Sequence, residues 1–136
     1  QMVKEESKGK EISNAAAAYH VLKPLFAEND DVEALYCIFL NGQNHVMAIE
    51  KMFSGTINYA TIFPRELVKR TLVLGASAVL MAHNHPSGNQ NPSESDLKIT
   101  QKIKEAGNLL DIQLLDHIII TPERDLYRSF ADEGQL

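Results

Sequence analysis

The sequence predicts an α/β fold, an α-β-α sandwich with a mixed central sheet, and three observations support this fold class. Segments of helical and strand character follow one another in the order helix, hairpin, helix, strand, helix and strands. Two strand-like segments flank the turn NGQN, which is typical of an antiparallel hairpin. A further run, ASAVLMAH, is short, apolar and bounded by turn residues, as interior strands are. Such a mixture of elements forms a sheet covered by helices.

The first half of the chain begins with residues 1–12, which are polar and charged without periodicity. We expect a flexible lead-in there, followed by a single domain over residues 13–136. Ser13 or Asn14 can cap a helix over AAAAYHVLKPLFA, and Pro24 kinks or ends that helix near its last turn. After an acidic break, VEALYCIFL and HVMAIEKMF are the two predicted strands of the hairpin.

The second half alternates predicted helices and strands. Pro64 suits the first position of a helix over PRELVKRTLVL, which Gly75 closes. The strand ASAVLMAH follows, and the loop PSGNQN then leads into a helix over about residues 92–110 that Asn91 or Ser93 can cap. IQLLDHIIIT and LYRSF are the last two predicted strands.

Composition and charge exclude several functional classes. With 136 residues, of which 44% are hydrophobic, the chain can bury a core without disulfide bonds. Its formal net charge of -5 does not support a nucleic-acid-binding surface, which needs clustered Lys and Arg. The single cysteine, Cys37, lies in the apolar run LYCIFL and predicts a buried side chain in a reducing compartment. No apolar run suits a membrane span or a signal peptide, so we expect a cytoplasmic protein.

The segment HNHPSGNQNPSESD, residues 83–96, carries the residues that we expect to perform chemistry. Alternate side chains of an extended segment point the same way, so the imidazoles of His83 and His85 converge at the end of the strand. The loop reverses the chain, and Asp96 falls in the first turn of the next helix, where the helix dipole favours negative charge. Two imidazoles and one carboxylate are three zinc ligands, which leaves the fourth tetrahedral position to water, as in catalytic sites. The segment therefore predicts one catalytic zinc ion per chain.

A carboxylate near such a site is needed to take a proton from water and to pass it to the leaving group. Glu50 is the first candidate, because its strand presents it among small and apolar side chains. Glu66, early in a helix, is the second candidate, although a solvated acid in a first turn needs no catalytic role. Ser93 could polarise a substrate carbonyl, cap the helix or do both.

His117 lies in the otherwise apolar segment LLDHIII and has several interpretations. With Asp116 it could form a structural hydrogen-bonded pair. It could also support a metal site from behind the ligands, or be a further ligand itself.

The spacing of these residues resembles a known motif. His83-x-His85-Pro86 followed by Ser93-x-x-Asp96 matches the JAMM motif of the JAB/MPN+ metalloprotease superfamily. The bacterial RadC family in particular has similar sequence in four segments of this chain. They are HNHPSGNQNPSESD, the downstream LLDHIII, FPRELVKRTL and EKMFSGT. The resemblance covers the chain from about Asn14 to Phe130.

The resemblance implies a zinc-binding α/β fold of the cytidine-deaminase-like type. It implies that His83, His85 and Asp96 bind the metal, that Glu50 is the acid/base and that Ser93 stabilises the oxyanion. Members of the superfamily that carry the full motif cleave peptide or isopeptide bonds. A zinc deaminase is disfavoured, since its signature pairs H-x-E with P-C-x-x-C, and this chain has one cysteine.

Two functional hypotheses follow from these residues. The first is a zinc metallopeptidase or isopeptidase that cleaves an amide bond in a peptide or protein substrate. The alternative is a non-catalytic, metal-containing interaction module of a DNA-repair or mobile-element-associated RadC-like protein. A closed site, in which His117 or Glu66 replaces water as the fourth ligand, would favour the module.

Overall fold

The computed structural model describes residues 7–28, 31–55 and 59–136, and within them the chain forms one mixed sheet with helices on both sides. The elements in chain order are α1 (Ala15–Ala27), β1 (Ala34–Leu40), β2 (Val46–Ser54), α2 (Tyr59–Leu74), β3 (Ala78–Asn84), α3 (Glu94–Leu109), β4 (Gln113–Ile120) and β5 (Tyr127–Ser129). This order confirms the predicted α/β sandwich.

The sheet has the strand order β2-β1-β3-β4-β5. β1 pairs antiparallel with both β2 and β3, β3 pairs parallel with β4, and β5 pairs antiparallel with β4. The hairpin of β1 and β2 is the predicted one, and the helix α3 makes the crossover that two parallel strands require. β3 lies in the middle, and all seven of its residues are buried, so its side chains contact only other protein layers.

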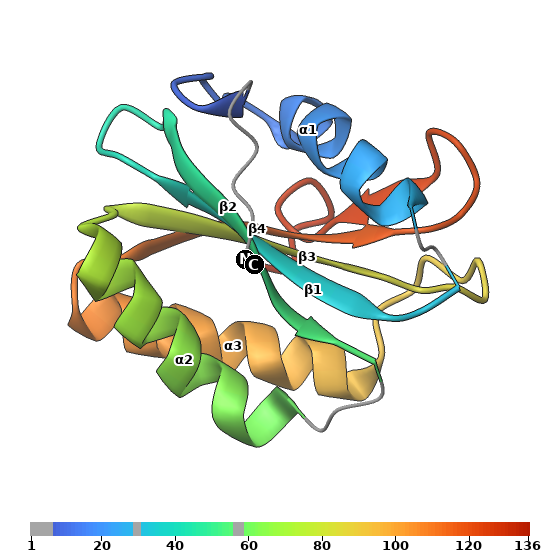
Figure 1. The fold of residues 1–136 in the computed structure, drawn as a ribbon. Coiled ribbons are helices and arrows are strands. Elements are labelled where there is room, and N and C mark those ends of the chain that lie inside the picture. Colours follow the sequence, from blue (N-terminus) through green and yellow to red (C-terminus); the bar gives the residue numbers. More distant parts are fainter. Residues whose placement is uncertain (1–6, 29–30, 56–58) are drawn as a thin grey trace.

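Two layers of helices cover the sheet, α1 on one face and α2 with α3 on the other (Figure 1). The side chains of β1 alternate between these layers: Ile38 packs in the cluster of α1, whereas Cys37 packs in the cluster of α2 and α3. On β3, Leu80 belongs to the first cluster and Met81 to the second. The period of two along β3 therefore directs His83 towards α2 and α3.

The helix that contains Pro64 differs from its prediction. A proline favours the first position of a helix, and the predicted helix therefore began at Pro64. In the structure α2 already begins at Tyr59, and Pro64 lies inside it. Phe63 is completely buried in the same cluster as Leu67. Burial of Phe63 against the sheet stabilises the helical turn upstream of Pro64. This outweighs the one backbone hydrogen bond that a proline inside a helix removes.

The lead-in predicted over residues 1–12 is corrected for its described part, residues 7–12. Gly9 donates a backbone hydrogen bond to Val46, Val46 donates one to Lys10, and each N···O distance is 2.9 Å. Ile12 is buried in the cluster under α1. These residues extend the sheet region next to β2, and their polar side chains hide this role in the sequence. Residues 1–6 lie outside the described part.

Among the described residues, no helix is both long and apolar enough to span a membrane.

A substitution at Gly107 tests how closely the chain packs at the end of α3. An added Cβ atom would lie 2.3 Å from the backbone oxygen of Ile112, where the chain folds back over the helix. Alanine favours a helix over glycine by about 1 kcal/mol, but a backbone carbonyl cannot move aside as a flexible side chain can. We expect Gly107→Ala to lower the free energy of unfolding by about 1–3 kcal/mol, as measured by urea denaturation.

Gly42→Ala is the matched control, because its added Cβ atom would contact only Ser77 Oγ at 3.9 Å. Its expected change is below about 0.5 kcal/mol. An unchanged or higher urea midpoint for Gly107→Ala would contradict the close approach of Ile112.

Candidate metal centre

Two histidines reach the centre from the end of β3. The backbone N–H of His85 donates to the carbonyl of Ile120 at 2.8 Å, so β3 stays aligned with β4 beyond its last residue. The extended conformation keeps His83 and His85 on the same face. Asn84 between them points to the opposite side, where its amide group donates to Val32 and accepts from the N–H of Ala34. Asn84 thereby ties the end of β3 to the start of β1.

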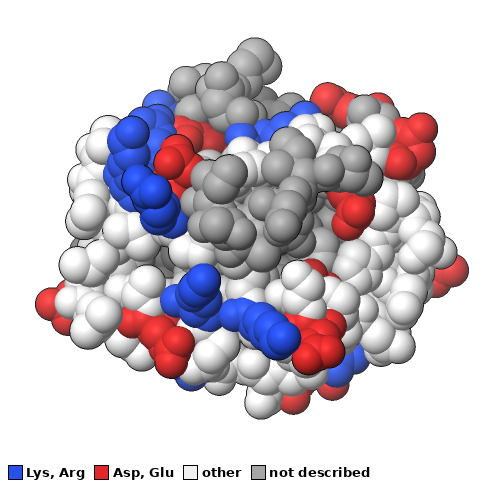
Figure 2. Space-filling view, turned by 90° about the horizontal axis from the view of Figure 1, so that it is seen from below, with Lys and Arg blue, Asp and Glu red and all other residues white. Residues whose placement is uncertain are grey.

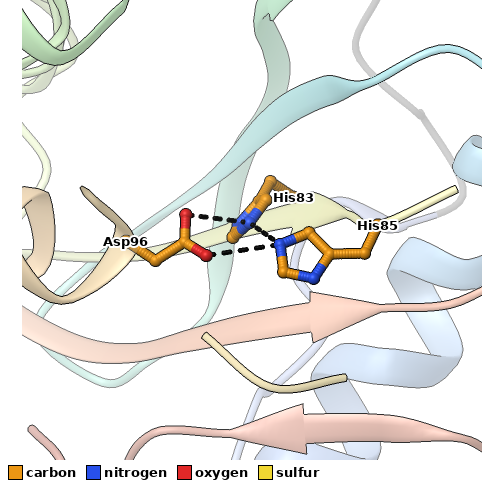
Figure 3. A group of neighbouring side chains, drawn as sticks. All are labelled: His83, His85 and Asp96. Carbon is orange, nitrogen blue, oxygen red and sulfur yellow. Dashed lines mark hydrogen bonds and ion pairs between the residues drawn. The ribbon is translucent and has the colours of Figure 1, made fainter. Parts of the chain in front are cut away.

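Asp96 approaches the same point from the first turn of α3 (Figure 3). His83 Nε2 lies 3.2 Å from Asp96 Oδ1, and His85 Nε2 lies 3.2 Å from Asp96 Oδ2. The two Nε2 atoms are 2.9 Å apart. One ligand atom from each residue lies within 4.8 Å of the others, which makes the three residues a group that could hold a metal ion. The structure thus brings together the three residues predicted as ligands.

Ser93 holds the carboxylate of Asp96 through a capping box at the start of α3. Ser93 Oγ accepts from the N–H of Asp96 at 3.0 Å, and the N–H of Ser93 donates to Asp96 Oδ2 at 2.8 Å. The capping role of Ser93 is confirmed. Its role at a substrate oxyanion stays a prediction.

His117 contacts His83 from behind and determines how the ring of His83 is protonated. Thr100 Oγ1 donates to the carbonyl of Asp96 at 2.8 Å, so it accepts from His117 Nδ1–H, 2.6 Å away. Burial holds the pKa of His117 well below its ordinary value, so the ring is neutral and its Nε2 is an acceptor. His83 Nδ1, 2.8 Å from that atom, therefore donates to it. The lone pair of His83 Nε2 is left facing Asp96.

His85 is oriented in the same way by the loop. Its Nδ1 donates to the backbone carbonyl of Asn89 at 2.7 Å, which leaves the Nε2 lone pair facing the centre. Two imidazole lone pairs and two carboxylate oxygens thus converge, and the N–H of Ser93 is the one donor described for these four atoms. Acceptors buried together without donors are costly, and a cation bound among them would remove that cost. The donor set fits a divalent metal ion with N/O ligands.

The pKa values of His85 and Asp96 show that positive charge is favoured at this site. The Asp96 carboxylate raises the pKa of His85 above its ordinary value, against the opposing effect of burial, because a ring protonated at Nε2 would donate a hydrogen bond to it. Burial disfavours the charged form of Asp96, but the nearby Nε2 atoms of His83 and His85, each a donor to the carboxylate when protonated, outweigh burial and hold the pKa of Asp96 well below its usual range. The carboxylate is therefore ionised at neutral pH and ready to bind a cation.

One interpretation of the sequence pairs Asp116 with His117. In the structure Asp116 contacts the backbone of His117 and not its ring. Its carboxylate accepts from the backbone N–H groups of His117 and Ala131 and from the hydroxyl of Ser129. Asp116 thus ties the segment around β5 to β4. The alternative interpretation, in which His117 supports the metal ligands from behind, agrees with the contact to His83.

Neither glutamate predicted as the acid/base contacts the centre. Both carboxylate oxygens of Glu50 accept from Arg70, at 2.7 Å from Nε and 2.6 Å from Nη2. Glu50 lies opposite Cys37 on β1, and Glu66 is exposed on α2. In the described part of the chain, no hydrogen bond or ion pair joins either of them to His83 or its partners. The catalytic role of Glu50 stays a prediction, and its present contacts are structural.

Glu33 lies beside the centre and was missed by sequence reasoning. With Phe53 and His83 it lines a small hollow at the start of β1. The Asp96 carboxylate is the main cause of the raised pKa of His85, and the negative charge of Glu33 adds to it. Glu33 is exposed, so its carboxylate meets solvent at the edge of the centre.

The signal for Glu33 lies in the pairing of β1 with β3. Leu35 is the partner of His83 in this antiparallel pair, so the position of Glu33 on one strand corresponds to that of His85 on the other. Pairing between strands far apart in the sequence cannot be deduced from the periodicity of either strand. For that reason the local pattern favoured Glu50.

Comparison with known proteins identifies the family. The RadC-like JAB domain family matches residues 12–135. A UPF0758 protein of Thiobacillus denitrificans is 43% identical over 128 residues, which are 94% of this chain and 56% of that protein. A UPF0758 protein of Nitrosococcus oceani is 49% identical over 104 residues, 76% of this chain and 46% of the relative. The chain spans about half the length of the curated relatives that it matches. From its sequence match and its fold, this chain belongs to the RadC-like JAB domain family.

Proposed function

We propose that this domain is a metal-dependent hydrolase that cleaves an amide bond in a peptide or protein. The observation that carries the proposal is the convergence of His83 Nε2, His85 Nε2 and both oxygens of Asp96 on one point. In the proposed site these three residues hold one zinc ion. A bound zinc ion lowers the pKa of a coordinated water to about 7 and polarises a carbonyl group.

The open character of the site favours an enzyme over the non-catalytic module. A structural zinc site has four protein ligands, whereas a catalytic site keeps one position for water or substrate. The group with metal-ligand geometry in the described residues has three members. His117 uses its Nε2 for His83, and Glu66 lies exposed on α2, so neither supplies the fourth ligand.

Amide hydrolysis needs a group that removes a proton from water and delivers one to the departing nitrogen. Glu33 suits this task, because it lies at the edge of the centre and is accessible to solvent. Glu50 would first have to leave Arg70, which engages both of its oxygens. We therefore assign proton transfer to Glu33 and a structural role to Glu50.

The hydroxyl group of Ser93 is available to donate a hydrogen bond to the substrate. Its Oγ accepts from the N–H of Asp96, and no described hydrogen bond uses the hydroxyl proton. The side chain is exposed next to the carboxylate of Asp96. The proposed role of Ser93 is to donate this proton to the substrate carbonyl oxygen as negative charge develops there.

Metal content tests the ligand set. Protein given zinc and then desalted is expected to retain about one zinc ion per chain, measured by mass spectrometry, since a complete site holds a single ion. His85→Ala is expected to lose the metal, because it removes one of the three ligands. His20→Ala is the matched control: His20 is exposed on α1, and this variant should retain the metal. Native protein without zinc above background would contradict the proposal.

Glu33→Gln and Glu50→Gln separate the two candidate carboxylates. Both variants should retain zinc, because neither residue is a proposed ligand. Glu33→Gln is expected to slow cleavage of a peptide and isopeptide library by at least about 100-fold, measured by mass spectrometry. Glu50→Gln breaks the pair with Arg70, so we expect it to lower the free energy of unfolding by about 1–3 kcal/mol and to keep cleavage. Cleavage lost in Glu50→Gln and kept in Glu33→Gln would reverse the two roles.

His117→Phe tests the support of His83. Phenylalanine keeps a ring at this buried position but removes the acceptor for His83 Nδ1–H, so His83 loses its orientation. We expect zinc affinity to fall by about 10- to 100-fold, measured by competition with a chromophoric chelator on protein that circular dichroism shows to be folded. Thr100→Val removes the hydroxyl behind His117 and should act in the same direction with a smaller effect. Native affinity in both variants would show that His83 needs no support.

A further inference from the structure

Four large apolar side chains are exposed together at the carboxyl ends of α2 and α3. Leu72 is 59% exposed, Val73 67%, Leu109 86% and Leu110 46%. They are four of the five exposed large hydrophobic residues in the described part of the chain. A single exposed leucine is common on protein surfaces, but a contiguous group marks an interaction site.

These side chains line a groove of about 730 Å³ between the two helices. From α2 come Arg65, Val68, Lys69, Leu72 and Val73, with Pro64 at one end, and from the end of α3 come Ala106, Leu109 and the C-cap residue Leu110. The spacings are i, i+3, i+4, i+7, i+8 on α2 and i, i+3, i+4 on α3, so each helix contributes one continuous ridge. We call this feature the α2/α3 groove.

α2 therefore carries two apolar stripes. Its inner stripe includes Phe63 and Leu67, which are buried against the sheet. Its outer stripe, Val68, Leu72 and Val73, faces the groove. A surface helix of a globular protein normally has a polar outer face. The second stripe thus has the pattern of a helix that packs against a further element.

The charges along the α2/α3 groove are positive. Of the nine lining residues, the charged ones are Arg65 and Lys69, both exposed and one turn apart on α2. No ion pair is recorded for either of them within the described residues. The whole chain has a formal net charge of -5, so this local positive charge is opposite in sign to the molecule. Figure 2 shows this face, where an uncharged area at the left lies beside blue basic side chains.

We propose that the α2/α3 groove binds an amphipathic helix of a partner protein, with its apolar stripe in the groove and acidic side chains opposite Arg65 and Lys69. Two helical ridges with an apolar floor accept a third helix by the helix-in-groove mode. Asp96 is in the first turn of α3, whereas Ala106 and Leu109 lie near its end, so the α3 side of the groove is roughly 15–20 Å along the helix from the candidate metal centre. The partner would leave that centre accessible.

Two synthetic helical peptides of about 15 residues, or about four turns, test the proposal. Both carry leucines at i, i+3, i+4 and i+7, flanked in one peptide by glutamates and in the other by lysines. We expect the glutamate peptide to bind at least about tenfold more tightly, measured by fluorescence anisotropy, and to weaken as salt is raised. Amide chemical-shift changes in NMR spectra should centre on the α2/α3 groove.

Variants of the groove give the decisive comparison. In Arg65→Glu/Lys69→Glu the preference should reverse to the lysine peptide. Leu72→Gln/Leu109→Gln should abolish binding of both peptides, whereas Leu97→Gln, which changes the fifth exposed apolar residue, should not. Equal binding of the two peptides, or unchanged preference in the charge-reversed variant, would overturn the proposal. A dimer in light scattering that Leu109→Gln dissociates would assign the groove to a second copy of this chain instead.

Discussion

The candidate metal centre depends on one buried hydrogen bond, from His83 Nδ1 to His117 Nε2. Parallel pairing of β3 with β4 sets it, because Met81 is the partner of His117 and His83 follows two residues later on the same face. Thr100 on α3 completes the chain by holding the other nitrogen of His117. Two strands and one helix thus determine which nitrogen of His83 faces Asp96, and a shift of one residue in this register would turn His83 to the other face.

The same crossover gives Asp96 its position. α3 begins near the carboxyl end of β3, and the capping box with Ser93 directs the Asp96 carboxylate to the histidines. One residue pair therefore does two things: it satisfies backbone groups at the start of the helix and presents an ionised carboxylate. The rigid elements around them hold two imidazole lone pairs and two carboxylate oxygens together. This preorganisation is what a metal site requires.

The two glutamates show how environment assigns roles to identical side chains. Glu50 is almost completely buried, and a buried carboxylate needs a partner, which Arg70 supplies with two hydrogen bonds. Glu33 is exposed just before the start of β1, where water satisfies its charge and where it is close to His83. The buried, paired carboxylate stabilises the fold, whereas the accessible one lies beside the candidate metal site and is open to water.

The sequence by itself determined the α/β class, the hairpin, the cap candidates of α1 and α3, and the grouping of His83, His85 and Asp96 as candidate metal ligands, because periodicity, capping and spacing act over a few residues. Only the tertiary structure decided that His117 supports His83, that Arg70 engages Glu50 and that Glu33 lies beside the histidines. It also extended α2 upstream of Pro64, since burial of Phe63 outweighed a local preference. These outcomes depend on strand order and register, which long-range packing sets and which no short segment of sequence encodes.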